Sequence, residues 1–311
     1  MTFNIHKKRA TFGAFFVCSL CAFLFCNSCT QQLRNTSQPL PAKHFLWKVQ
    51  KNGSELWLLG SIHMAPQSLY PLAPALEQAF AHSSEVAVEI NIAEDSTLTQ
   101  VTRAMVQRGS YAAGDRLEKH IRPELMNQMD SLFAAWDLPV KAMHGMRPWF
   151  LAIRLGDIAA ERSGVTADEG VDLHFLDEAK RTHKPVRSLE TVAEQMNVFF
   201  GMEDSLQELL LQYTLQESTD LQTSLDTMFT YWKTGDTLGL ARIARSDLDD
   251  PRFKVFAQRL YYDRNIHMAQ QIESYLTARR KVLVIVGSAH LVGEGSVVRL
   301  LRKHGYTVTQ Q

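Results

Sequence analysis

The chain carries one short pattern at two places that lie far apart in the sequence. LWLLGSIH ends at His63 and LVIVGSAH ends at His290, so both have four apolar residues, Gly, Ser, one small or apolar residue and His. A short apolar run of this kind is typical of a buried strand in an α/β sheet. Ligands of such sheets bind beyond the carboxyl ends of the strands. If the two strands are neighbours, both histidines face one pocket.

Two glycines and a glutamate complete this candidate site. Gly60 and Gly287 each precede a histidine by three residues and allow a sharp exit with close backbone approach. Glu89 lies near the end of the apolar run SEVAVEI, where an unpaired charge is costly. Two neutral imidazoles and a carboxylate form a plausible divalent-metal site with open positions for water and substrate. Because such an ion generates hydroxide near neutral pH, the set indicates hydrolysis.

Strand patterns cluster at the two ends of the chain. The Asn-Gly pair of KNGS between two apolar runs predicts an opening β-hairpin, and KVLVIVGSAH and YTVTQ predict strands near the C-terminus. From about residue 95 to 264 the apolar spacing is helical, apart from one short strand at 185–190. We therefore predict an α/β fold whose central mixed sheet is built from both ends of the chain, flanked by helices, with a large helical insertion.

The N-terminal segment has the pattern of an export signal. Basic residues 7–9 precede the run TFGAFFVCSLCAFLFC, which is short for a stable membrane span. We expect a signal peptide over residues 1–28, whose removal leaves 30 basic and 33 acidic side chains. This balance gives no electrostatic case for binding nucleic acid, which we exclude as a partner.

Cys29 is the candidate point of membrane attachment. It follows Ser28 and precedes a polar, proline-containing tether at 29–43, an arrangement that resembles a bacterial lipoprotein signal. A plain secretory peptide or an uncleaved anchor is the alternative, and in each case the domain at 44–309 is exported. With the lipid anchor we expect it in the cell envelope. All four cysteines lie at or before Cys29, so this domain has no internal disulfide.

The motifs together resemble the TraB/GumN family, also called the TIKI/PrgY group. Its marks are two Gly-x-x-His motifs and a glutamate after the intervening strand, matched here by residues 60–63, Glu89 and residues 287–290. Further similar pieces are LYPL at 69–72, RPW at 147–149, GVD at 170–172, SLET at 188–191, DRN at 263–265 and GSAHLVGEGSVVRLLRKHGYTV up to residue 308. The resemblance spans about residues 44–309.

This resemblance implies a fold similar to the erythromycin esterase/ChaN-like group. It also implies membrane-associated, metal-dependent proteolysis, as in the animal members that trim secreted signalling peptides with manganese or cobalt. The expected partner is then a peptide or protein substrate, and the expected cofactor is a divalent ion, with manganese, cobalt and zinc as candidates. Many bacterial members have no established substrate, so the resemblance supports a site better than a particular reaction.

Roles follow from the resemblance residue by residue. His63 and His290 become metal ligands or catalytic histidines, and Glu89 becomes a ligand or a general base. Arg264 is suited to stabilising the oxyanion that forms when water attacks a carbonyl, with Asn265 positioning it.

Two of the predicted roles have structural alternatives, and a third residue is expected to be structural only. Arg264 is alternatively a surface charge at a helix start. Glu190 acts as a general base or supports the site, or else caps the helix that follows it. Asp172 is expected to cap or orient a helix start, because it follows Gly170 and opens a helical segment.

We predict a membrane-associated, divalent-metal-dependent hydrolase, most simply a peptidase. One alternative keeps the same residues without metal and uses a histidine as general base in ester hydrolysis. The other is an envelope protein that binds and sequesters a peptide, haem or another small ligand without cleaving it. His144, His174 and His183 lack a paired motif and are expected to be surface or packing residues.

Overall fold

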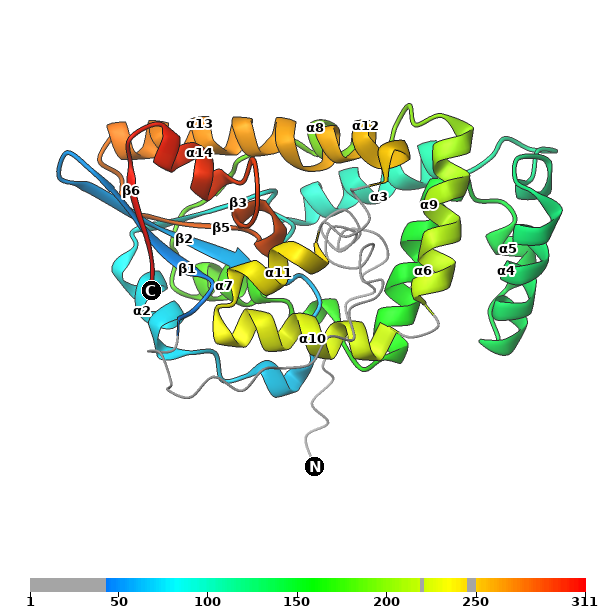
Figure 1. Cartoon of the computed structure of the whole chain (residues 1–311), viewed down its shortest axis with the longest axis horizontal. Coiled ribbons are helices and arrows are strands. Elements are labelled where there is room, and N and C mark those ends of the chain that lie inside the picture. Colours follow the sequence, from blue (N-terminus) through cyan, green and yellow to red (C-terminus); the bar gives the residue numbers. More distant parts are fainter. Residues whose placement is uncertain (1–42, 219–220, 245–249) are drawn as a thin grey trace.

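The computed structural model describes residues 43–218, 221–244 and 250–311 of the chain. This part contains a six-stranded sheet with the order β4-β3-β5-β2-β1-β6 (Figure 1). Its strands are β1 (Leu46–Lys51), β2 (Ser54–Ser61), β3 (Glu85–Val88), β4 (Val186–Ser188), β5 (Val282–Gly287) and β6 (Thr307–Gln310). β4, β3, β5 and β2 are parallel, whereas β1 is antiparallel to both of its neighbours. The predicted mixed sheet is confirmed.

The predicted hairpin opens the fold. β1 and β2 pair from Leu46 and Leu59 to Lys51 and Ser54. Asn52 and Gly53 form the turn with φ values of 51° and 76°, and this left-handed conformation at both positions matches the twist of the strands. β5 then lies between β3 and β2, and each of its residues is buried, as its continuous apolar sequence predicts.

Helices cover both faces of the sheet. Figure 1 shows α13 (Asp263–Thr277) and α14 (Val297–Lys303) above the sheet and α2 (Pro74–His82) and α7 (Val171–Arg181) below it. A π-helical turn, η5 (Gln258–Tyr262), leads directly into α13. Turns of this type are frequent near functional sites.

Most of the segment at 95–264 extends away from the sheet, on the right in Figure 1. Its other helices are α3 (Asp95–Gly109), α4 (Pro123–Ala135), α5 (Val140–Met143), α6 (Pro148–Arg162), α8 (Val192–Met196), α9 (Asp204–Glu217), α10 (Leu221–Thr234), α11 (Thr237–Ile243) and α12 (Lys254–Ala257). The segment also supplies β4, which is the edge strand of the sheet, and α7, which covers the lower face of the sheet. The insertion is therefore integrated with the sheet.

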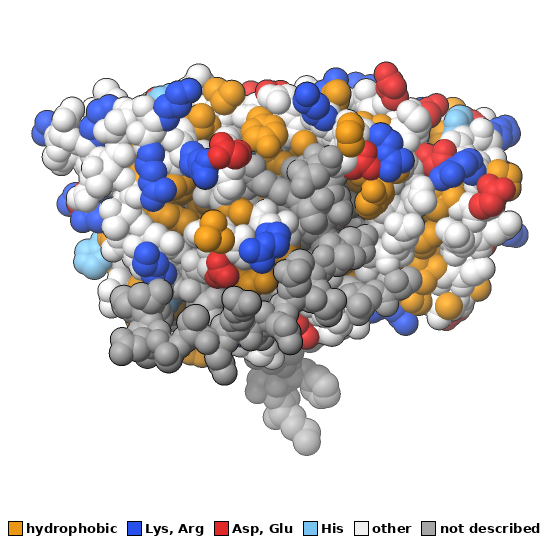
Figure 2. Space-filling model, viewed as in Figure 1, with side chains coloured by type: hydrophobic (Ala, Val, Ile, Leu, Met, Phe, Trp, Pro, Cys, Tyr) orange, Lys and Arg blue, Asp and Glu red, His pale blue; other side chains and the backbone are white. Residues whose placement is uncertain are grey.

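The predictions on the signal peptide at 1–28, on Cys29 and on most of the tether lie outside the described residues. Within residues 43–218, 221–244 and 250–311, no helix combines the length and the apolar composition of a membrane span. Figure 2 shows basic and acidic side chains interspersed on the visible face, without a continuous basic field.

Candidate active site

Three parallel strands end at the same edge of the sheet and carry the three predicted ligands. β5 is hydrogen-bonded to β2 on one side and to β3 on the other. His63 follows β2, Glu89 follows β3, and His290 lies in η6 (Ser288–Leu291), the short turn after β5. All three side chains are buried. The prediction that the two Gly-x-x-His strands are neighbours is confirmed.

Gly287 leaves the space in which these groups meet. A Cβ atom at this position would lie 3.0 Å from His63 Nε2, 3.3 Å from Glu89 Oε1 and 3.7 Å from His290 Cδ2. At Gly60 a Cβ would lie 2.9 Å from Ser288 Oγ. Gly287 has a φ of −51°, which any residue adopts. The missing side chain at Gly287 therefore allows the two histidines and Glu89 to approach the backbone closely. It is not needed for a sharp turn.

Glu89 accepts hydrogen bonds from three sides. The Gly287 amide donates to Oε1 at 2.7 Å, while Arg264 Nη2 and Gln195 Nε2 donate to Oε2 at 2.6 and 3.1 Å. Burial alone would raise the pKa of this carboxyl group, but the positive charge of Arg264 and the other contacts lower it from 4.5 to about 2. Glu89 is therefore a carboxylate at neutral pH.

Arg264 connects Glu89 to a second buried carboxylate. Its Nε donates to Glu190 Oε1 at 2.9 Å and its Nη2 to Glu190 Oε2 at 2.7 Å. The expectation of a surface charge at a helix start is wrong, because Arg264 is 7% exposed. The capping alternative for Glu190 is also wrong, since Thr191 and Glu194 form the capping box of α8. The contacts of Glu190 with Arg264 agree with the other interpretation, in which Glu190 supports the site.

His290 has both ring nitrogens engaged. Nδ1 lies 2.6 Å from Asn265 Oδ1, and Asn265 Nδ2 donates to the Gly295 carbonyl at 2.9 Å, which fixes the orientation of the amide. His290 Nδ1 is therefore the protonated nitrogen. Arg264 Nη1 donates to Nε2 at 3.2 Å. The structure thus places Asn265 against His290, whereas the sequence suggested that it positions Arg264.

His63 has its own carboxylate partner. Its Nδ1 lies 3.1 Å from Asp172 Oδ2, and both side chains are buried. Burial by itself would lower the pKa of His63, but the carboxylate of Asp172 outweighs it and raises the pKa above 6.5. Asp172 makes no side-chain cap, and Gly170 occupies the cap position of α7. Its expected capping role is therefore wrong, and it contacts a predicted ligand instead.

The three donors are of the types that bind a divalent metal ion. His290 Nδ1 faces the Asn265 oxygen, an arrangement that usually orients a ligating Nε2. His63 Nδ1 lies 3.1 Å from Asp172 Oδ2 without the geometry of a hydrogen bond. His290 Nε2 lies 3.9 Å from Glu89 Oε1, and His63 Nε2 faces the same point beside Gly287. Across the described ranges, however, no three His, Cys, Asp or Glu side chains are already arranged as a ligand set. Arg264 is the cation that contacts Glu89 and His290.

The buried cluster is adjacent to two hollows of different character. On one side, His63 and Gly287 line a narrow hollow of about 30 Å³ beneath α10 and α11. On the other side, Glu190 and Arg264 line a wider hollow of about 450 Å³ together with Arg259, Asp263 and other polar residues. The two histidine-bearing strand ends and the Arg264–Glu190 pair therefore border different hollows.

Sequence reasoning missed Gln195, which is fully buried and donates to Glu89. A glutamine in the helical run TVAEQM gives no signal of its own, because its partner lies 106 residues earlier.

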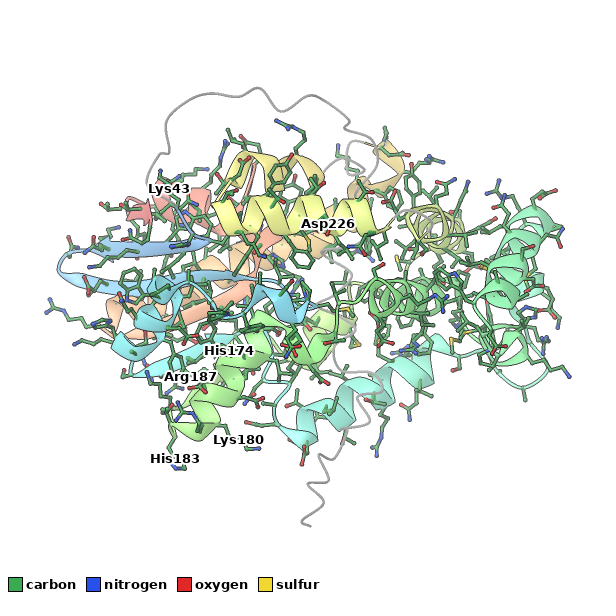
Figure 3. The ribbon with its side chains drawn as sticks, turned by 90° about the horizontal axis from the view of Figure 1, so that it is seen from below. Lys43, His174, Lys180, His183, Arg187 and Asp226 are labelled. Atoms are coloured by element: carbon green, nitrogen blue, oxygen red, sulfur yellow. The ribbon has the colours of Figure 1, made fainter. Side chains whose placement is uncertain are left out.

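The remaining histidines lie outside the cluster. His174 on α7 contacts Glu77, and His144 contacts Asp130 at the far end of the insertion. In Figure 3, His183 projects outward beyond α7. These positions agree with surface or packing roles.

Comparisons with known proteins give sequence matches over most of the chain. The family model described as TraB/PrgY/gumN matches residues 45–310. An uncharacterized Escherichia coli protein, YbaP, is 24% identical over 271 residues, covering 85% of this chain and 95% of its own length. The zebrafish (Danio rerio) metalloprotease TIKI1 and its human counterpart are each 22% identical over 85% of this chain and over 62% and 61% of their own lengths. No solved structure gives a significant match.

Proposed function

The chain belongs to the TraB/PrgY/gumN family, and from this premise we propose that it is a hydrolase that cleaves peptide bonds. The observation that carries the proposal is the convergence of His63, Glu89 and His290 on the space beside Gly287. Relatives of low identity that are named metalloproteases support the same class of reaction. Many hydrolases combine such donors with a divalent ion.

In this proposal His63, Glu89 and His290 would hold a divalent metal ion, for which manganese, cobalt and zinc are the candidates. Binding would require Arg264 Nη1 to release His290 Nε2. When bound, such an ion polarises a carbonyl and lowers the pKa of water. Asp172 and Asn265 hold the two imidazoles in their orientations. Glu89 stays ionised because its pKa is about 2.

Arg264 supplies the positive charge for the substrate. Its guanidinium is held rigidly by two bonds to Glu190, so it is pre-oriented for a carbonyl oxygen that becomes negative as water attacks. Glu190 serves as the positioning residue of Arg264.

A second candidate function is hydrolysis without metal, favoured by the contact of His63 with Asp172. A histidine whose Nδ1 faces a carboxylate is arranged to accept a proton from water at Nε2. In this metal-free mechanism Arg264 keeps its contacts with Glu89 and His290 during the whole reaction.

Chelation distinguishes the two mechanisms. The full-length chain, purified in detergent, is incubated with a mixture of synthetic peptides, and fragments are identified by mass spectrometry. The metal-dependent proposal predicts cleavage that is lost after treatment with EDTA and restored by manganese, cobalt or zinc. Cleavage that survives complete metal removal supports the metal-free mechanism, and unchanged but bound peptide supports sequestration and contradicts both.

We also propose that the domain is exported and attached to the membrane through a lipid on Cys29. The support is the sequence pattern of residues 1–28 and of the polar tether. We expect Cys29→Ala to move the protein from the membrane fraction to the soluble fraction after cell fractionation. Equal membrane association of both forms would contradict lipid attachment at this residue.

A further inference from the structure

The narrow hollow beside His63 has apolar walls and a polar floor. His63, Gly287, Ser61 and Ser288 line the side formed by the strand ends. The apolar lining comes from six side chains, of which two adjoin the strand ends and four lie on or beside α10 and α11: Ile62, Ala289, Met228, Leu240, Ile243 and Ala244. About one probe sphere of 10–15 Å³ is needed per water molecule, so about 30 Å³ accommodates only a small group.

The walls of this hollow are fixed by contacts to the strand ends. Trp232 on α10 donates from Nε1 to the Gly60 carbonyl at 2.9 Å, which holds α10 over the end of β2. Asp236 caps α11 by accepting from the amides of Leu238 and Gly239. Leu240 is then 4% exposed and faces inward, whereas Leu238 on the same helix is 77% exposed. The size of the hollow is thus set by packed side chains.

Ser61 contributes a buried hydroxyl group without a partner. Its side chain is 2% exposed, and Oγ has no hydrogen bond within the described part of the chain. Ser61 pairs in register with Gly287, so both positions face the same side of the sheet, toward the candidate ligands. By contrast, Ser288 Oγ donates to the Ser61 carbonyl at 2.9 Å. An unsatisfied buried hydroxyl is costly, and a ligand oxygen would satisfy it.

We propose that this hollow is the subsite for a small apolar side chain of the substrate, next to the bond that is cleaved. Ser61 Oγ donates a hydrogen bond to the backbone carbonyl of the same substrate residue. The inference rests on the proposed peptide hydrolysis. Apolar walls disfavour a charged side chain, and the small volume favours alanine or valine over an aromatic ring.

Substrate preference tests the size of the subsite. The full-length chain is given peptides that differ at one position by Gly, Ala, Val, Leu, Phe or Lys, with that position scanned along the peptide. We expect kcat/KM to be at least about tenfold higher for Ala or Val than for Phe at one position next to the cleaved bond. Leu240→Ala should raise kcat/KM for Leu and Phe by about tenfold, because it enlarges the hollow.

Leu238→Ala is the matched control, since it removes an exposed leucine from the same helix. It should keep the preference of the unchanged protein. An identical preference in the unchanged protein and in Leu240→Ala would overturn the subsite.

A second measurement does not depend on turnover. Methyl NMR signals of Ile62, Met228 and Ile243 are followed while isobutyramide or benzamide is added, because these small amides carry a carbonyl and a side chain of different size. We expect isobutyramide to shift the three signals and benzamide to shift them only in Leu240→Ala. Shifts of this kind without any peptide cleavage would uphold the subsite and contradict the proposed function. Cleavage without such shifts would overturn the subsite alone.

Ser61→Ala tests the hydroxyl. It should weaken isobutyramide binding about fivefold or more, as expected for a lost hydrogen bond of about 1 kcal/mol. Its urea midpoint should not fall, because the removed group has no partner in the protein. Ser288→Ala, which loses a hydrogen bond to Ser61, should unfold at lower urea. Unchanged isobutyramide affinity in Ser61→Ala would overturn the role of the hydroxyl.

Discussion

Replacing Arg264 with methionine is expected to lower the free energy of unfolding by about 3–5 kcal/mol, because two buried carboxylates lose their shared positive partner. Arg264 contacts Glu89 at 2.6 Å and Glu190 at 2.7 Å, and all three side chains are buried. Methionine preserves most of the apolar volume but none of the charge. Urea unfolding at pH 7 measures the loss.

The destabilisation caused by Arg264→Met should depend on pH, because the pKa of Glu89 is lowered in the folded protein. Its pKa is about 2 in the folded protein against 4.5 ordinarily, so its charge stabilises the fold above pH 4.5 and this contribution is lost as pH falls toward 2. Arg264→Met removes the main favourable charge. The difference in stability between the two proteins should therefore be largest at neutral pH and shrink as the pH falls toward 2.

Arg259→Met is the matched control, since Arg259 is an exposed arginine on the π-helical turn immediately before Asp263. It should change the free energy of unfolding by less than about 0.5 kcal/mol. Arg264→Met combined with Glu190→Gln should recover part of the stability, because one unpaired charge is removed. Equal urea midpoints for Arg264→Met and Arg259→Met would contradict the buried network.

Glu89→Gln is expected to reduce peptide hydrolysis by about 100-fold or more, the usual effect of removing an essential acid–base or charge-stabilising group. The amide oxygen of glutamine still accepts from the Gly287 amide, and Arg264 keeps its two bonds to Glu190. The fold should therefore persist while the negative charge is lost. Initial rates of fragment formation, measured by mass spectrometry, test this expectation.

Glu55→Gln provides the comparison, since Glu55 lies on the hairpin and pairs with Lys48 away from the cluster. It should hydrolyse at the rate of the unchanged protein. A Glu89→Gln protein with that same rate would exclude Glu89 from the reaction.

The sequence alone indicated the strands that end at the candidate site and the three side chains at its centre, which are His63, Glu89 and His290. The repeated pattern before His63 and His290 predicted two buried strands whose histidines meet if the strands are neighbours, and the sheet pairs them directly. The Asn-Gly turn predicted the hairpin for an equally local reason. The strand pattern and the turn can both be recognised from neighbouring residues, without knowing which residues they contact in the fold.

The partners of charged residues could not be predicted in this way. Arg264 lies 74 residues after Glu190 and 175 after Glu89, so a helical segment around it is equally compatible with a surface position. Asp172 likewise has the local pattern of a cap, and only the tertiary fold brings it to His63. Long-range pairing depends on how α7 and α13 pack on opposite faces of the sheet.

The central claim is that His63 and His290 act as one site. The most direct measurement compares the peptide hydrolysis rates of His63→Ala, His290→Ala and the double variant, all as folded full-length chains. Residues that act as a unit give non-additive losses, so we expect each single variant to lose about 100-fold or more and the double variant to lose no more than either. A double variant whose loss is the product of the two single losses, or a single variant with the original rate, would contradict the claim.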